Sequence, residues 1–185
     1  MPNWCDNWVK LSHDDPAVVS RAAESFQRGR FLTEFVPVPP ELDKTQATIP
    51  PSAEQLANKA RYGYESWFDW CGEHWGTIKE LFSAVATPCD DGHGLEVRFD
   101  SAWSPPRAAF ETLEKRHGFC LTAYYFEPDM HVCGMRVNGV TREIDISNVK
   151  SPEEAKAIIP PEMDARLGVS TGGAFSFEDD SDADD

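Results

Sequence analysis

The stretch LEVRFDSAWSPPRAAFETLEKRHG, residues 95–118, decides the fold because it joins a strand directly to a helix. Apolar and charged residues alternate over residues 95–100, which is the pattern of a strand with one buried face. Ser104 stands where a helix N-cap is expected, and Pro105 occupies the first helical position, where a missing N–H is tolerated. Gly118 can adopt the left-handed conformation that ends a helix. The stretch therefore predicts a strand–helix unit of a small α+β domain.

Length and composition are those of a globular chain. The chain has 185 residues, of which 41% are hydrophobic, so one domain with a substantial core is expected. It contains no apolar run of about 18 residues, as a membrane span requires, and its opening MPNWCDNWVK has no signal-peptide pattern. We therefore expect a cytoplasmic protein without a membrane partner and with free thiols. The five cysteines are Cys5, Cys71, Cys89, Cys120 and Cys133.

The chain is strongly acidic, with 32 acidic residues, 17 basic residues and a net charge of -15. Six of the acids lie in residues 178–185, and the other 26 acids against 17 bases still leave a net charge of -9. Such a chain repels the phosphates of nucleic acid overall. It attracts basic proteins, so we expect a basic protein partner and no direct contact with nucleic acid.

The first half of the chain predicts a strand, a helix and a long connection. Residues 4–11 alternate as a strand, and a capped helix begins at Pro16. Five prolines within residues 30–51 predict an extended connection over the surface. Residues 52–74 then predict a helix that is broken near Gly63.

Residues 77–86 are ambiguous. Their apolar positions at helical spacing slightly favour a helix, whereas the flanking Gly76 and Pro88 also permit a strand. Both interpretations stay open on the residues alone.

The second half of the chain predicts a strand, a hairpin and a helix. Residues 119–126 form a nearly continuous apolar run, as in a central strand. Asn138-Gly139 predicts a type I′ turn between two further strands. Ser151 and Glu154 predict a capping box for a helix that ends by Pro160.

Several segments together resemble the YubB-like family of plasmid and phage proteins. They are MPNWCDNWV at residues 1–9, FVPVPPEL at 35–42, WGTIKE at 75–80, FDSAWSPP at 99–106 and YYFEPDMHVCG at 124–134. The resemblance spans residues 1–146. It implies an α+β, ferredoxin-like β-α-β-β-α-β sandwich with a helical insertion before strand two and an extra C-terminal hairpin.

The resemblance also implies that residues 77–86 are strand two and that the insertion covers about residues 30–76. The resemblance does not extend to the acidic tail. From Leu167 on, Gly172-Gly173 and the acidic run predict a disordered acidic tail over residues 167–185, which leaves a single domain over residues 1–166. The resemblance implies no activity or catalytic residue, and the term ferredoxin-like names a fold and does not imply an iron–sulfur cluster.

One set of residues has a spacing that suits zinc. Cys71-x2-His74 and Cys89-x3-His93 place two possible ligands on each of two short segments. A metal-assisted hydrolase that uses these four residues and zinc is therefore the alternative function. Ordinary core and surface roles are the favoured interpretation, so we expect no cofactor.

A second set alternates along a predicted strand. Asp129, His131 and Cys133 are two residues apart, so neighbours on a strand lie roughly 6.6 Å apart and can share an ion. A polar face at the edge of the sheet is the simpler interpretation.

An aromatic-rich segment provides the candidate partner-binding surface. Residues 62–75 contain six aromatic side chains with acidic residues interleaved at four-residue spacing. A base-stacking surface needs basic residues instead, so we expect a docking face for a basic protein. An amphipathic helix with buried aromatics is the simpler alternative. The candidate residues are Glu65, Trp67, Asp69, Trp70 and Glu73.

The acidic tail extends this candidate surface through Glu178, Asp179 and Asp180, although runs of charge are usually just solvated. The sequence contains no P-loop, GxSxG, HExxH or GxGxxG motif. The acidic chain and the lack of these motifs favour a cytoplasmic interaction protein, which binds a basic, nucleic-acid-handling protein, over an enzyme. The resemblance implies that it is of phage or plasmid type. Nucleic acid binding through a locally basic sheet face is a third hypothesis, which conflicts with the net charge.

Overall fold

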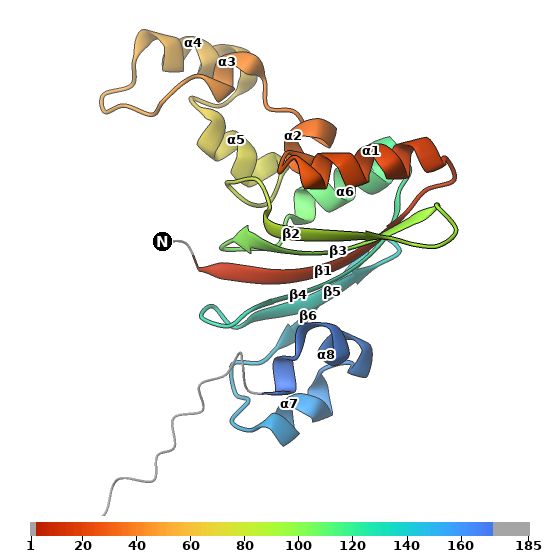
Figure 1. The fold of residues 1–185 in the computed structure, drawn as a ribbon. Coiled ribbons are helices and arrows are strands. Elements are labelled where there is room, and N and C mark those ends of the chain that lie inside the picture. Colours follow the sequence, from red (N-terminus) through yellow and green to blue (C-terminus); the bar gives the residue numbers. More distant parts are fainter. Residues whose placement is uncertain (1–2, 172–185) are drawn as a thin grey trace, which may run out of the picture.

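The computed structural model describes residues 3–171, which form one antiparallel sheet with helices on both faces (Figure 1). The strands are β1 (Trp4–Ser12), β2 (Phe82–Pro88), β3 (Gly94–Ala102), β4 (Cys120–Glu127), β5 (Val132–Val137) and β6 (Val140–Asp145). The helices are α1 (Pro16–Gln27), α2 (Phe31–Phe35), α3 (Pro40–Asp43), α4 (Ala53–Tyr62), α5 (Trp67–His74), α6 (Arg107–His117), α7 (Pro152–Ile158) and α8 (Pro161–Leu167), with a 3-10 turn at Val169–Thr171.

The sheet has the strand order β2-β3-β1-β4-β5-β6, with every neighbouring pair antiparallel. The first four strands with α1 and α6 make the β-α-β-β-α-β core that the resemblance implied. Strands β5 and β6 extend this core beyond β4 as the extra hairpin. Their turn has positive φ at Asn138 (49°) and Gly139 (79°), which confirms the type I′ prediction.

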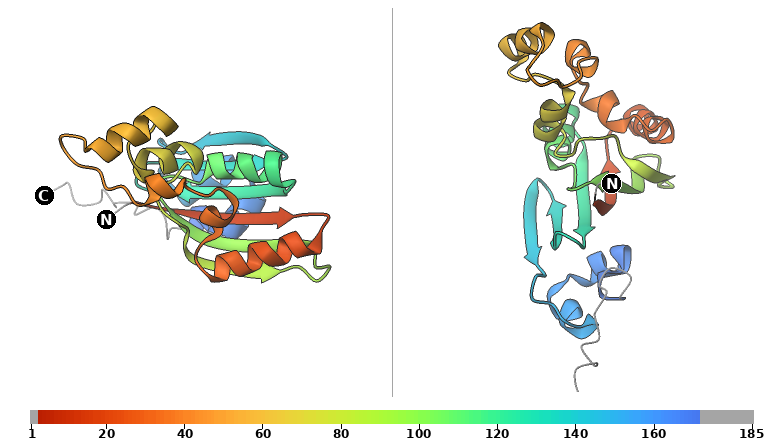
Figure 2. Two further views of the ribbon diagram at one scale, coloured as in Figure 1. Left: turned by 90° about the horizontal axis from the view of Figure 1, so that it is seen from above. Right: turned by 90° about the vertical axis from the view of Figure 1, so that its left-hand side faces the viewer.

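Helices α1 and α6 cover one face of the sheet (Figure 2). The beginning of α1 and the end of α6 lie where the sequence predicted. Asp15 caps α1 by accepting a hydrogen bond from Ala17 N, and Gly118 ends α6 with φ 73°. The main core lies between these helices and the sheet, where Leu11, Phe99 and Leu113 are at most 2% exposed.

The beginning of α6 differs from the prediction. The helix begins at Arg107, and Ser104 donates a hydrogen bond to Gly76 O instead of capping the helix. Gly76 has φ 82° and passes so close to the helix that a Cβ would lie 2.8 Å from Arg107 N. In the first turn of α6, Ala109 N donates a hydrogen bond to Trp75 O, and the Ser104 hydroxyl joins the same two segments.

The insertion contains short helices where the sequence predicted an extended connection. Phe31, Leu32 and Phe35 are buried by one helical turn, α2, and Glu80 accepts hydrogen bonds from Leu32 N and Thr33 N at its start. The burial of these apolar side chains and the hydrogen bonds to Glu80 therefore stabilise α2, although prolines follow it in the sequence. The break near Gly63 is confirmed, since this residue ends α4 with φ 85°.

The ambiguous segment is a strand, as the resemblance implied, and the preference of its periodicity for a helix was wrong. The strand begins later than expected, at Phe82. Pairing with β3 outweighs the local pattern, because Ala84 and Ala86 pack against the main core from this strand.

Helices α7 and α8 cover the opposite face and form a second core with β1, β4, β5 and β6 (Figure 1). Residues 167–171, which the sequence assigned to the tail, belong to this core. Leu167 and Val169 are buried, and Asp164 accepts hydrogen bonds from Ser170 N and Oγ. The rest of the expected tail, residues 172–185, lies outside the described residues.

Among residues 3–171, no helix is long and apolar enough to cross a membrane.

Candidate functional site: the two edges of the sheet

The predicted aromatic surface is largely inside the protein. Trp70 is 8% exposed and Trp67 packs against the main core, while Phe68 remains exposed. Tyr64 and Trp70 both contact the His74 ring, with centroids 5.6 and 4.4 Å apart. The side chains of this segment therefore mainly anchor the insertion.

The three acids of this segment do not share one helical stripe. Asp69 and Glu73 are exposed on α5, but Glu65 precedes the helix and its carboxylate lies 2.7 Å from Lys59 Nζ. Asp69 and Glu73 are therefore the exposed acids of this set. Glu178, Asp179 and Asp180 lie outside the described residues.

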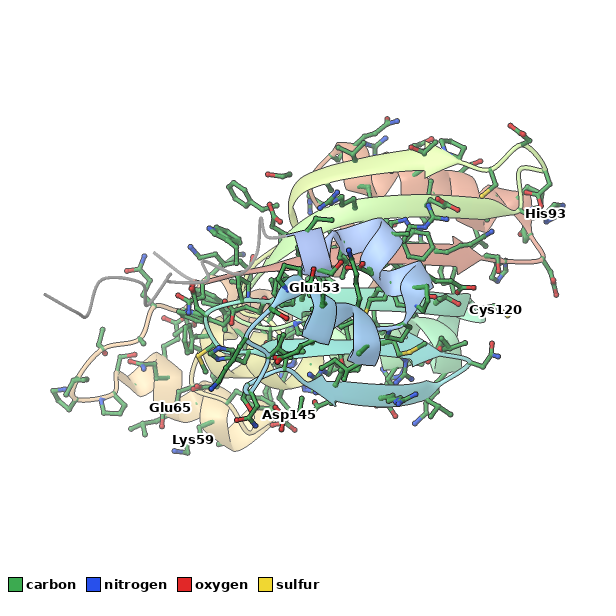
Figure 3. The ribbon with its side chains drawn as sticks, turned by 90° about the horizontal axis from the view of Figure 1, so that it is seen from below. Lys59, Glu65, His93, Cys120, Asp145 and Glu153 are labelled. Atoms are coloured by element: carbon green, nitrogen blue, oxygen red, sulfur yellow. The ribbon has the colours of Figure 1, made fainter. Side chains whose placement is uncertain are left out.

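The possible zinc ligands lie far apart. Cys71 is buried in α5, whereas Cys89 and His93 lie at the β2–β3 turn at the opposite end of the sheet. Figure 3 labels Glu65, near α5, and His93 at opposite ends of the molecule. Burial raises the pKa of the Cys71 thiol to about 12, so it is a poor thiolate ligand. Within residues 3–171, no three His, Cys, Asp or Glu side chains are grouped to hold a metal.

Asp129, His131 and Cys133 do not share a strand face either. β5 begins only at Val132, because Glu127 accepts hydrogen bonds from Asp129 N and Met130 N and thereby stabilises a turn. Cys133 then faces the second core, where burial raises its pKa to about 12. The turn therefore separates the three side chains.

The β6 edge, meaning the outer side of strand Val140–Asp145, is regular and open. Its ladder with β5 runs without interruption from Val137↔Val140 to Val132↔Asp145, and its sequence VTREID contains no proline. Within the described part of the chain, no strand pairs with its outer side. Its charged side chains, Arg142, Glu143 and Asp145, disfavour pairing with a strand of like charge, but its regular backbone can pair with a strand of complementary charge.

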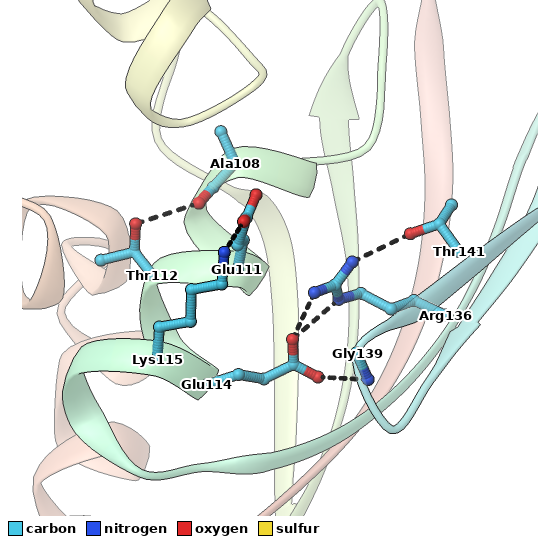
Figure 4. A network of polar contacts seen from close by, with 8 residues as sticks. All are labelled: Ala108, Glu111, Thr112, Glu114, Lys115, Arg136, Gly139 and Thr141. Atoms are coloured by element: carbon cyan, nitrogen blue, oxygen red, sulfur yellow. Dashed lines mark hydrogen bonds and ion pairs between the residues drawn. The ribbon is translucent and has the colours of Figure 1, made fainter.

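The β6 edge is held in place by an ion pair from α6 (Figure 4). Glu114 Oε2 accepts hydrogen bonds from Arg136 on β5, and Glu114 Oε1 accepts one from Gly139 N at the hairpin turn. Arg136 also donates to Thr141 Oγ1 on β6. The side chains of Arg136 and Glu114 are only 10% and 14% exposed, so the pair fixes the hairpin to the core.

Two hollows flank the β6 edge. One of about 670 Å³ lies between α6 and the hairpin, and Phe119, Leu121 and Thr141 are among the residues that line it. Another of about 300 Å³ lies at the other end of the strand, beside Glu143 and Asp145. The edge therefore has space for side chains next to its free backbone.

The β2 edge, the outer side of strand Phe82–Pro88, is irregular. The pairing with β3 is interrupted between Phe82 and Val85, where Ser83 has φ 51°, and the strand ends at a proline. Bulges and prolines are features that protect a sheet edge from further pairing.

The strand nevertheless presents apolar groups to solvent. Phe82 and Val85 are 58% and 67% exposed, and the Phe82 ring packs on Trp4 with centroids 5.2 Å apart. Charged residues of β1 and β3 line the sheet beside them: Arg98 Nη2 is 2.5 Å from Asp6 Oδ2. Burial and the nearby Asp6 raise the pKa of Asp100. This sheet face is of mixed charge, so it is not the locally basic face of the third hypothesis.

Sequence reasoning did not single out the β6 edge as a candidate site. A signal was present, since the segment after Asn138-Gly139 is charged and lacks proline. Its exposed position depends on the strand order, which the residues of the segment itself do not encode.

Comparison with known proteins supports the fold assignment. Residues 82–158 match the family described as the ferredoxin-like domain in Api92-like protein. The match runs from β2 through α7 and thus includes the β6 edge. The resemblance drawn from the sequence is confirmed at this coarser level, for this part of the chain.

One solved structure is also similar, the protein api92 from Yersinia pseudotuberculosis. The two chains share 10% identity with a TM-score of 0.45, over 77% of this chain and 97% of that chain. No curated protein matches the sequence.

Proposed function

We propose that this protein acts by binding a basic protein partner and that the β6 edge is the docking surface. The single observation that carries the proposal is a regular, open strand whose one face bears Glu143 and Asp145 in an acidic chain. Charge of this kind attracts a basic protein and accelerates the encounter.

The negative charge of the chain also indicates the class of partner. A basic surface that normally holds nucleic acid is a suitable target for an acidic protein, since both ligands present negative charge. The resemblance to YubB-like proteins adds an accessory role in a plasmid or phage, in the cytoplasm of the host. Binding, and no catalysis, is the proposed activity.

Charge reversal tests the proposal. Glu143→Lys with Asp145→Lys changes the β6 edge, and the matched control, Asp69→Lys with Glu73→Lys, makes the same change on α5. Both variants and the full chain are used to capture proteins from host lysate, and a captured basic protein is purified and titrated.

The β6 variant is expected to lose at least about tenfold in affinity, and the control much less. Equal affinity of all three proteins would contradict recognition by charge. Loss only in the control would move the docking surface to α5.

A further inference from the structure

The outer backbone groups of β6 belong to one alternating set of residues. Residues that flank a two-residue hairpin turn form a hydrogen-bonded pair, which here is Val137 with Val140. The antiparallel ladder then alternates, so the N–H and C=O groups of Thr141, Glu143 and Asp145 point away from β5. These groups are available to an additional strand.

We infer that β6 accepts an extended segment of the basic partner as a seventh strand, with basic and apolar residues in alternation. This inference rests on the proposed function and specifies how its site binds. Main-chain hydrogen bonds to an exposed edge provide affinity in this mode of recognition, and alternate side chains provide specificity.

The two faces of β6 determine the alternation. Thr141, Glu143 and Asp145 lie on the α6 side, because Thr141 pairs with Arg136 and Glu143 forms an ion pair with Arg107. Side chains of an added strand that lie opposite these acids are favourable when they are basic.

The opposite face carries Val140, Arg142 and Ile144. Val140 is 71% exposed there, and Ile144 packs into the second core. Apolar side chains of the added strand would extend this surface.

The hollow between α6 and the hairpin has room for a side chain of the added strand. Phe119 and Leu121 line it and can cover an apolar stem, whereas its acids Glu111 and Glu114 already pair with Lys115 and Arg136. The hollow therefore provides space beside the edge, and Glu143 and Asp145 provide the charge.

A second copy of the chain fits the β6 edge poorly. In a symmetric dimer that pairs the two β6 strands, the twofold axis is normal to the sheet, so each side chain faces one from the same side of the sheet. The axis then passes beside one residue, which lies directly opposite its own copy. The two registers with most overlap are centred on Arg142 or Glu143, and each places a charge directly opposite its own copy. Like charges in that position are destabilising, and the net charge of -15 on each copy adds repulsion.

The test uses the full chain and three synthetic peptides of roughly eight residues, the length of a strand. One alternates lysine and valine, one alternates glutamate and valine, and one is the first peptide with a central proline. Each is titrated by calorimetry into the natural protein, into Glu143→Pro and into the β2 control Phe82→Ser. The variant Glu143→Pro removes an outward N–H and leaves the ladder to β5, a position where edge strands tolerate proline.

Only the lysine–valine peptide is expected to bind the natural protein and Phe82→Ser. Glu143→Pro and the central proline should each weaken binding at least about tenfold, the value of a hydrogen bond of roughly 1.4 kcal/mol. If Glu143→Pro fails to fold, as judged by circular dichroism, the proline-containing peptide provides the same comparison on the natural chain.

Equal binding of both lysine peptides would overturn strand addition and leave charge attraction, the proposed function, intact. If no peptide binds but a purified basic partner still binds through Glu143 and Asp145, strand addition is overturned and the proposed function stands. Stronger binding of the acidic peptide would contradict the inference and the proposed function together.

Discussion

The two edge strands of this sheet, β6 and β2, differ in the regularity of their pairing. The β6 edge is a regular strand with a continuous ladder, and the β2 edge is bulged at Ser83 and ends at Pro88. Both are exposed, yet only the first presents an ordered row of backbone groups with acidic side chains on one face. On the proposal made above, regular geometry marks the binding edge better than exposed apolar groups do, since those are more numerous on β2.

Removal of the Glu114 carboxylate should have the largest effect on stability, and it should loosen the β6 edge and not the β2 edge. Glu114→Ala leaves Arg136 almost buried without its partner and should lower the free energy of unfolding by about 3 kcal/mol. Urea unfolding measures the loss. The labelling rate of buried Cys133, by mass spectrometry, should rise as the hairpin opens more often.

The double variant Glu114→Leu with Arg136→Met is the control, because replacement of both partners by apolar side chains restores most of the stability. An unchanged Cys133 labelling rate in Glu114→Ala would mean that this ion pair does not hold the β6 edge.

A methyl group at Gly134 should distort β5 beneath the β6 edge. A Cβ there would meet Tyr125 Oη at 2.5 Å and Arg142 O at 2.7 Å. Gly134→Ala should therefore cost about 2 kcal/mol of stability, as overpacking of a core does, and weaken partner binding at β6.

Calorimetric unfolding compares this variant with Gly72→Ala, where the added methyl meets nothing within 4 Å. The control should be neutral or slightly stabilised, as alanine is in a helix. Equal stability of both variants would show that β5 can move away from Tyr125 without loss.

A glycine at the bulge of the β2 edge should stabilise the protein slightly. Ser83→Gly removes the unfavourable positive φ of a side-chain-bearing residue, worth about 1 kcal/mol. It also removes a hydrogen bond to Asp100 of roughly half that value. The net expectation is a gain of about 0.5 kcal/mol in urea unfolding, and a loss instead would show that the hydroxyl stabilises the bulge.

The carboxyl of Asp100 should give the smallest effect, and one that depends on pH. Its pKa is raised in the folded protein, so the folded state binds its proton more tightly than the unfolded state does. Stability from this group is therefore present below the unfolded pKa and is lost as pH rises through the folded pKa.

Asp100→Asn should be slightly more stable than the natural protein at pH 7 and no more stable near pH 3, in thermal unfolding at both values. The difference is small because solvent screens a partly exposed group. A stabilised variant at pH 3 but not at pH 7 would contradict the direction of the shift.

Much of the fold could be predicted from local sequence. Gly118 and Asn138-Gly139 adopt the positive φ values that their positions required, and Asp15 caps α1 as expected. The misses have tertiary causes. Ser104 bonds Gly76 across the fold, α2 forms because two phenylalanines are buried together, and β2 is a strand because it pairs with β3.

The candidate site was predicted less well than the fold. The interleaved acids and aromatics of residues 62–75 suggested a surface, but Trp70 and Trp75 face the core, as the simpler alternative proposed. Periodicity cannot tell which side of a helix meets the rest of the protein. The β6 edge depends on strand order, which a reading of single segments does not provide.

Hydrogen exchange of the backbone amides tests the central claim most directly, with and without the lysine–valine peptide. Addition of a strand should protect the outward amides of Thr141, Glu143 and Asp145 and leave those of β2 unchanged. Protection confined to β2, or binding of the peptide with no change at β6, would contradict the account.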